Sequence, residues 1–369
     1  MEYETETYEK KVTVMLNFTV GPVMSNPDII EIANHSTPYF RTPEFSEIML
    51  ENESMILEML HAPAGSRCVF LTSAGTGAME SMVMNILNDK DKIIVINGGS
   101  FGHRFVELCE LHKREHTQVK CEFGHQIKRR QLDGLEDYTA MLVNMHETSS
   151  GVLYDMNMIS EFCRKNNIQL FVDAISAFLA DELDMEGLRA AAVITGSQKA
   201  LAVQPGIAVM ALAPEALKRI EENKEVCMYL SLKQALKNGE RGQTPFTPAV
   251  TTLLQIHKRL KEILSQGGVF EERRMIASTA ENFRSSIKDL PFEFVAESPS
   301  NAVTALHPIN VRATEIVKIL KNEYGIWACP NGGDKADEIF RIGHIGYITK
   351  EDNNKLIDAL HNMNRRGLL

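Results

Sequence analysis

Short apolar runs alternate along the first 211 residues with stretches in which apolar residues recur every three or four positions. Such runs are typical of strands buried on both faces of a parallel sheet, and the longer spacing is typical of helices. Expected helices begin after Pro43, near Ala78, at Gly102 and at Met158. The alternation predicts an α/β fold with a mostly parallel, doubly wound sheet. The expected strands are 12–19, 68–72, 93–97, 119–123, 141–145, 169–172, 190–194 and 206–211.

The pattern changes after about residue 214. Three long helical patterns come first, and a short module of strands and one final helix follows, which predicts a second, smaller domain. We therefore expect an amino-terminal segment (1–25) at the edge of the active site, a large domain (26–255) and a small C-terminal domain (256–369). The expected elements are helices 215–222, 250–264, 270–287 and 350–363, and strands 292–296, 303–306, 326–329 and 339–342.

Composition narrows the classes of function. The chain has 39 Lys and Arg against 49 Asp and Glu, a formal charge of −10, which argues against binding to nucleic acid or anionic membranes. Its one basic cluster, Lys128–Arg130, fits a solvated turn. The acidic start Met1–Glu6 lacks the apolar core of a signal peptide, and no apolar stretch is long enough to span a membrane. The six cysteines form no CxxC pair, so we expect reduced, buried thiols in a cytoplasmic protein, and no metal site.

A lysine stands directly after one of the expected strands. The run Ala190–Ile194 leads into the turn Thr195–Ser197, and Lys199 follows. Open α/β sheets bind ligands in the crevice outside the carboxyl ends of their strands. An ammonium group is costly to bury there unless it is paired, neutralised or used covalently. Lys199 is therefore a candidate to form a Schiff base with an aldehyde cofactor, and the alternative is a surface lysine at a strand exit.

Other strand ends should reach the same crevice. The turn Ser73–Gly77 opens a helix, where free N–H groups and the helix dipole suit a phosphate, although it matches neither a P-loop nor a dinucleotide turn. Asp173, Asn97–Phe101 and His146–Ser150 end or follow other strands. Pyridoxal phosphate needs a phosphate cradle, a carboxylate that keeps the ring nitrogen protonated, and a lysine that binds the aldehyde and then acts as a base.

Taken as a set, these motifs resemble the class V aminotransferases, pyridoxal-phosphate enzymes of fold type I, over nearly the whole chain. Gly196–Leu201 looks like the family's lysine motif, and Phe171–Ser176 is similar to its aspartate strand. His146–Gly151 resembles the turn whose hydroxyls approach the phenolic oxygen of the cofactor. Ser73–Glu80 matches the phosphate turn, and Asn97–Arg104 matches the segment whose aromatic residue stacks on the pyridine ring. The resemblance implies a large domain with a mostly parallel, seven-stranded type of sheet and a smaller C-terminal α+β domain.

The resemblance also implies roles for single residues. Lys199 and Asp173 would be catalytic. Arg341 would take the substrate carboxylate in a bidentate fork, and Gly21 would touch the same carboxylate. The segment Gln243–Pro248 would reach the phosphate of the neighbouring subunit, which implies a homodimer with shared active sites. The implied cofactor contacts are Ala74, Gly75, Thr76, Phe101, Thr148, Ser149, Asp173, Ile175, Gln198, Lys199, Gln243 and Thr244.

The implied reaction moves an amino group from a small amino acid or aminophosphonate to a pyruvate- or glyoxylate-type 2-oxo acid. Alanine/serine–glyoxylate and 2-aminoethylphosphonate–pyruvate aminotransferases look like the nearest relatives. Arg41 precedes the expected helix cap Thr42; it could bind a phosphonate or second carboxylate, or form a structural ion pair.

Two other classes of function stay open. Cysteine desulfurases share this fold and place a reactive cysteine before the carboxylate-binding arginine, and Cys329 lies twelve residues before Arg341. Cys329 is expected in a strand, where a thiol would be inert packing, and Gln198 stands where those enzymes resemble one another in having histidine, so aminotransfer is favoured. The third class is a sheet domain that binds an anion without chemistry.

Overall fold

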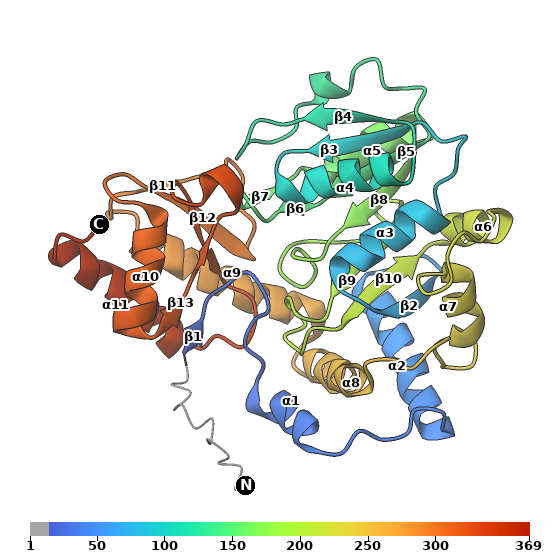
Figure 1. Cartoon of the computed structure of the whole chain (residues 1–369), viewed down its shortest axis with the longest axis horizontal. Coiled ribbons are helices and arrows are strands. Elements are labelled where there is room, and N and C mark those ends of the chain that lie inside the picture. The colour runs from blue at the N-terminus through green and yellow to red at the C-terminus, as the bar shows by residue number, and fades with distance from the viewer. Residues whose placement is uncertain (1–14) are drawn as a thin grey trace, which may run out of the picture.

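The structure is a computed structural model that describes residues 15–369 (Figure 1). The expected strand 12–19 lies partly outside the described residues. Its described part is β1 (Leu16–Asn17), which pairs in parallel with β13 (Ile326–Trp327) of the C-terminal region. Among residues 15–369, no helix combines the length and apolar character needed to cross a membrane.

A seven-stranded mixed sheet forms the centre of the large domain, as expected from the alternating pattern. Six strands run the same way, and β10 alone is antiparallel to both of its neighbours. Every residue of β9 is buried, which accounts for the unbroken apolar run in that part of the sequence. In sheet order the strands are β2 (Arg67–Thr72), β10 (Ile207–Leu212), β9 (Ala190–Gly196), β8 (Gln169–Asp173), β5 (Ala140–Asn144), β3 (Ile93–Asn97) and β4 (His116–Lys120).

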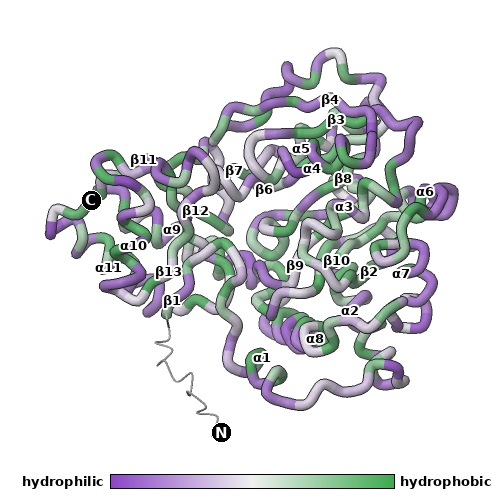
Figure 2. Tube along the Cα trace, in the orientation of Figure 1, coloured by the Kyte–Doolittle hydropathy of each residue, from purple (hydrophilic) through white to green (hydrophobic). Residues whose placement is uncertain are grey.

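Helices cover both faces of this sheet, with one buried apolar cluster on each face (Figures 1 and 2). One face carries α3 (Gly75–Asn85), α4 (Ser100–Leu111), α6 (Pro214–Glu222) and α7 (Leu232–Gly239). The opposite face carries α2 (Pro43–Met59), α5 (Met156–Lys165) and α8 (Val250–Ser265).

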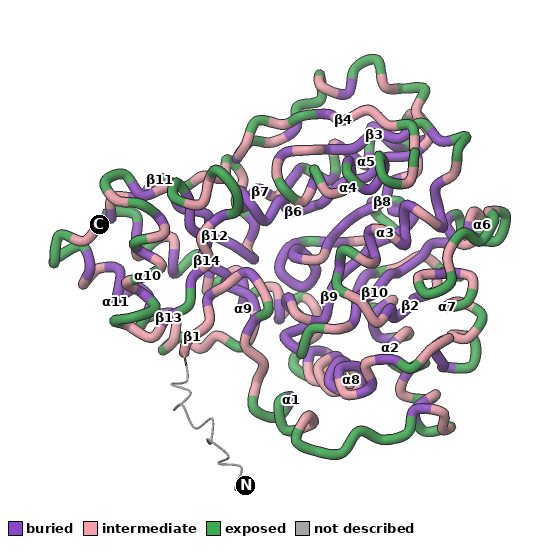
Figure 3. Tube along the Cα trace, in the orientation of Figure 1, coloured by how far each residue is buried: buried purple, intermediate pink, exposed green. Residues whose placement is uncertain are grey.

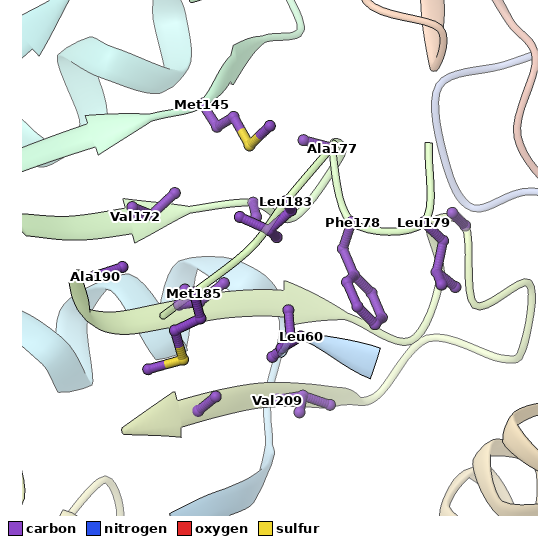
Figure 4. Close-up of a cluster of buried hydrophobic side chains, with 14 of the residues drawn as sticks. Leu60, Met145, Val172, Ala177, Phe178, Leu179, Leu183, Met185, Ala190 and Val209 are labelled. Atoms are coloured by element: carbon purple, nitrogen blue, oxygen red, sulfur yellow. The ribbon is translucent and has the colours of Figure 1, made fainter. Parts of the chain in front are cut away.

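The segment that follows β8 folds back onto the sheet (Figure 4). Phe178 and Leu183 from this segment pack with Met145, Val172 and Val209 in one buried cluster. The amide of Ala174 donates a backbone hydrogen bond to Ile194 O on β9 at 2.9 Å. This packing holds the residues directly after β8 in one position, and the candidate site is built on them.

The C-terminal region forms the expected smaller domain around a third apolar cluster (Figure 3). Its sheet is antiparallel, with the order β11 (Phe292–Phe294), β12 (Val303–Pro308), β15 (Phe340–Gly343) and β14 (Cys329–Pro330). Its helices are α9 (Gly268–Ser286), α10 (Ala313–Tyr324) and α11 (Lys350–Arg365). The expected boundary between residues 255 and 256 falls inside α8, and it stays a prediction.

Several element boundaries differ from the expected ones. The strand expected at 119–123 is β4, three residues earlier; it is an edge strand, and its polar residues made it hard to recognise. The single strand expected at 326–329 is two short strands, β13 and β14, which pair with different sheets. Helices α7, α10 and the short α1 (Pro27–Glu31) were not expected.

Candidate active site

A cavity of about 130 Å³ lies at the carboxyl ends of β8 and β9 and at the start of α3. It brings together most of the site residues expected from the sequence, and in addition Met79, Arg104, His146 and Ser176. The expected residues that do not line it are Gly21, Arg41, Ser149, Gln243, Thr244 and Arg341. The expected residues that line it are Ala74, Gly75, Thr76, Phe101, Thr148, Asp173, Ile175, Gln198 and Lys199.

Lys199 lies in a tight turn directly after β9. Its amide donates to Gly196 O at 3.3 Å, and its carbonyl accepts from Ala202 N at 2.8 Å. The ammonium donates to Val20 O, and the side chain is only 9% exposed. Gly21 has a φ of +120°, which favours glycine, and a Cβ atom there would lie 2.8 Å from Lys199 Cδ. Burial, followed by the charge of Arg341, lowers the pKa of Lys199 to about 8, while Asp173 opposes this shift.

Asp173 ends β8 on the neighbouring strand and is in register with Ile194. Its Oδ1 accepts from Ile175 N at 2.8 Å. Within residues 15–369, no cationic nitrogen lies within ion-pair distance of this carboxylate. Burial raises the pKa of Asp173 to about 6, the hydrogen bond from Ile175 opposes the rise, and Glu147 adds to it. The carboxylate is therefore buried without a direct ion-pair partner, and the charges of Lys199 and Arg104 lower its pKa only from a longer distance.

The start of α3 faces the same cavity. Ala74 is the N-cap residue and makes no side-chain capping bond, so the first N–H groups of the helix have no partner within it. A Cβ atom on Gly75 would lie 2.3 Å from Cδ1 of Ile175, which explains the glycine. Thr76 Oγ1 accepts from Arg104 Nη1 at 3.2 Å. The Arg104 guanidinium lies 5.0 Å from the centre of the Phe101 ring, so a cation and an aromatic ring flank this helix end.

The turn after β5 adds polar groups to the cavity wall. Thr148 Oγ1 and Ser176 Oγ are 2.8 Å apart. Ser149 lies in the same turn, but its hydroxyl donates to Glu147 Oε1 at 2.5 Å, behind the cavity wall. His146 is buried, and neither ring nitrogen has a hydrogen-bond partner. Burial, Lys199 and Arg341 lower the pKa of His146 to about 3, so its imidazole is neutral.

Sequence reasoning missed Arg104 as a lining residue, and it expected His146 at the crevice as part of His146–Ser150 without giving it a role. Both stand inside segments that the sequence marked, His146 two residues before Thr148 and Arg104 three residues after Phe101. Their position at strand and helix ends was the available signal.

Arg341 approaches the site from the small domain. Its Nη1 donates to Thr148 O at 3.3 Å, and its Nη2 donates to Pro330 O at 3.0 Å and to Cys329 Sγ at 3.2 Å. Its Nε is buried and has no hydrogen-bond partner. The guanidinium is thus held beside the turn that lines the cavity, and its charge reaches Lys199.

Cys329 lies in a strand, β14, as expected, and it packs against the large apolar cluster. Its thiol is partly exposed and accepts from Arg341 Nη2 at 3.2 Å, and the expectation that it is chemically inert stays a prediction. Cys121 and Cys227 are also partly exposed, so the expectation of six buried thiols holds only for Cys68, Cys109 and Cys163. All six are free thiols.

Arg41, Gln243 and Thr244 lie together away from the cavity. Arg41 Nη1 donates to Gln243 Oε1 at 3.2 Å and to Thr244 O at 2.9 Å, and Nη2 donates to Pro245 O. The Gln243 amide also donates to Ser46 Oγ at 2.7 Å. Arg41 therefore donates hydrogen bonds, within one chain, to the segment that was expected to reach a neighbouring subunit. No group of three potential metal ligands occurs in the described part of the chain.

Comparisons with known proteins show the family of the chain. The model of the aminotransferase class-V family matches residues 31–339. The 42 kDa subunit of a soluble hydrogenase from Anabaena cylindrica is 28% identical over 88% of this chain and 86% of that protein. The L-aspartate–glyoxylate aminotransferase of Paracoccus denitrificans is 25% identical over 90% of this chain and 86% of that protein.

Solved structures share the fold. An aspartate aminotransferase of subgroup IV from Thermus thermophilus superposes with a TM-score of 0.89 at 23% identity, over 95% of this chain and 99% of that chain. The family model covers well over half of the chain, and it brings with it the cofactor that such enzymes use. The chain belongs to the class V aminotransferases and is a transaminase that depends on pyridoxal phosphate.

Proposed function

We propose that this enzyme moves an amino group from a small amino acid or aminophosphonate to a glyoxylate- or pyruvate-type 2-oxo acid. The glyoxylate reaction in the name of the Paracoccus denitrificans relative supports this acceptor class. The observation that carries the proposal is the placement of Lys199 and Asp173 on neighbouring strand ends in one cavity. An amine and a carboxylate on either side of a ring-sized space are what the cofactor requires.

The cavity has room for the cofactor's ring and offers the chemistry that the cofactor needs. A cavity of about 130 Å³ is close to the ~150 Å³ space that accepts one benzene ring, so a pyridine ring can enter it. Asp173 has no direct ion-pair partner, and a protonated ring nitrogen would supply one. The start of α3, with Thr76 and Arg104 beside it, would take the phosphate. Phe101 and Ile175 would pack against the ring.

When bound, the cofactor supplies an electron sink for the substrate carbon. Lys199 would hold the cofactor's aldehyde through Nζ, and its free amine would serve as the base that moves a proton. Its lowered pKa, about 8, suits both roles because a neutral amine is accessible near neutral pH. Arg341, with Gly21 nearby, would hold the substrate carboxylate.

We also propose that the enzyme is a homodimer. Met228 and Tyr229 are 74% and 55% exposed, and Tyr229 stacks on Phe246 at 5.5 Å between ring centres. These apolar side chains lie beside Thr247, which is exposed, in the segment expected to meet a second subunit. An exposed apolar cluster of this kind is typical of an interface. A monomer mass in sedimentation would refute the dimer.

The affinity for the cofactor should depend on pH through Asp173. Above its pKa of about 6 this carboxylate is charged and can pair with the ring nitrogen. Below pH 6 the carboxylate is protonated. A cofactor with a protonated ring nitrogen can then pair with it only if Asp173 first releases its proton to the solvent. We therefore expect the affinity to fall by up to about tenfold per pH unit below 6. Equilibrium titration of the apoenzyme at several pH values measures this; Asp173→Asn should lack the dependence, and a flat wild-type profile would contradict it.

The substrate class is tested by half-reactions with single substrates. Purified enzyme carrying its cofactor is mixed with one amine at a time from a panel of small amino acids and 2-aminoethylphosphonate, while the visible absorbance band is followed. The proposal predicts that members of this panel convert the cofactor to its amine form and that glyoxylate or pyruvate restores it. Conversion by none of them, or restoration by neither acid, would refute the proposed substrates.

A second candidate reaction keeps some support from Cys329. Its thiol is partly exposed and lies against Arg341, where a desulfurase would need it. Serine keeps a hydrogen-bond acceptor for Arg341, so we expect Cys329→Ser to retain aminotransfer within about twofold. Release of sulfide from L-cysteine by the wild type, together with loss of all turnover in the variant, would favour the desulfurase instead.

A further inference from the structure

Glu147 is a buried carboxylate that the reaction described above does not use. It belongs to the short strand β6 (His146–Glu147) and is 0% exposed. No lysine, arginine or histidine of residues 15–369 forms an ion pair with it. A buried charge without a cation is retained only where hydrogen bonds stabilise it strongly. The partners of Glu147 therefore indicate its purpose.

Five donors from three different parts of the chain converge on this carboxylate. Oε2 accepts from Gly102 N at 2.9 Å and from Asn144 Nδ2 at 2.9 Å. Oε1 accepts from Phe101 N at 3.4 Å, and from the amide and hydroxyl of Ser149 at 3.1 and 2.5 Å. Glu147 thus joins the start of α4, the end of β5 and the turn at 148–150.

The start of α4 is capped by this carboxylate together with Ser149, whose hydroxyl accepts from Ser100 N at 3.3 Å and itself donates to Glu147. Gly99 occupies the N-cap position and offers no side chain to the free N–H groups of the first turn. A Cβ atom on Gly99 would lie 2.6 Å from Glu147 Cδ, so glycine gives the carboxylate room. A negative charge at a helix N-terminus is also favoured by the helix dipole. Glu147 therefore replaces the usual capping side chain from another part of the chain.

We propose that Glu147 is a positioning residue of the active site: it caps α4 from a distance and thereby holds Phe101, Arg104 and the 148–150 turn against the cofactor. The inference rests on the proposed contacts of Phe101 and Thr148 with the cofactor. Phe101 supplies one of the five hydrogen bonds, and Arg104 stands one helical turn further along. Loss of the cap would let the aromatic ring and the cation move while the fold of the sheet stays intact.

The test compares Glu147→Gln with the wild type and with Glu272→Gln. Glutamine keeps the shape but turns an NH₂ group toward backbone donors, so at least one amide of the first turn loses its acceptor. We expect affinity for pyridoxal phosphate to fall about tenfold or more. Amide exchange of the apoprotein in the peptide covering 98–105 should speed up, and the circular dichroism of the bound cofactor should change. Glu272 is a buried carboxylate outside the cavity, paired with Arg259.

Glu272→Gln controls for the general effect of neutralising a buried acid, so it should lower the melting temperature without changing cofactor affinity. Equal cofactor affinity, dichroism and exchange in Glu147→Gln and the wild type would overturn the proposal. If Glu147→Gln does not fold, Asn144→Ala removes one of the five donors and should show the same changes on a smaller scale; no change there also overturns it. A wild type that binds no cofactor would instead refute the proposed function, whereas the exchange measurement on the apoprotein still reports on the cap.

Discussion

Replacing Lys199 by alanine should abolish the visible band of the enzyme-bound cofactor and lower turnover by about 10⁴-fold or more. The substitution removes the amine that would bind the aldehyde and the base that would move the proton, and no second lysine lines the cavity in the described residues. His146 cannot replace it as a base, because its pKa is about 3. Absorbance spectra and steady-state assays of the variant measure both effects.

The Lys199→Ala variant should fold like the wild type. Burial opposes the charged form of Lys199, so its removal relieves a cost and the melting temperature should stay equal or rise. Small primary amines added to the assay should restore part of the proton transfer, because they can enter the space that the side chain leaves. A variant with a normal band and normal turnover would show that Lys199 is not the catalytic lysine.

Asp173→Asn should lower kcat by about 10³-fold while the protein stays folded. Asparagine has nearly the same shape but cannot balance a protonated ring nitrogen. A charge pair about 4 Å apart is worth about 4 kcal/mol at an effective dielectric constant of 20, and this corresponds to about three powers of ten in rate. The effect should appear in kcat more than in KM, because the ring charge matters most when the substrate carbon carries excess electrons.

Asp181→Asn is a matched control for this variant. Asp181 is also buried, and its pKa is also raised to about 6. It accepts hydrogen bonds from Ser300 Oγ and Asn301 N outside the cavity. We expect Asp181→Asn to destabilise the fold and leave kcat of the folded enzyme close to that of the wild type. Equal losses of kcat in the two variants would mean that Asp173 has only a structural role.

The sequence alone was enough to predict the position of the site residues that stand at strand ends. Lys199 and Asp173 could be placed in one crevice because parallel neighbouring strands end at the same edge of a sheet, and the apolar runs marked those ends. The same rule predicted that the turn Ala74–Thr76 lies in this crevice, because a strand and a helix with clear periodicity flank it. These residues line one cavity in the structure.

Contacts between distant segments could not be predicted in this way. Arg41 is held by the segment 243–245, and the five donors of Glu147 come from positions between 101 and 149, so neither partner set follows from periodicity. Cys329 was placed in a strand correctly, but its exposure depends on which sheet that strand joins. The periodicity of the sequence predicts which helix or strand forms and which of its faces is buried. It does not predict which other element that face packs against.

We expect Lys199 to hold pyridoxal phosphate covalently in this cavity. Reduction of the cofactor-loaded enzyme with borohydride, followed by proteolysis and mass spectrometry of the peptides, tests it directly. We expect a phosphopyridoxyl group on the peptide that contains Lys199 and on no other lysine. Its appearance on a different lysine, or on none in an enzyme that shows the visible band, would contradict the claim.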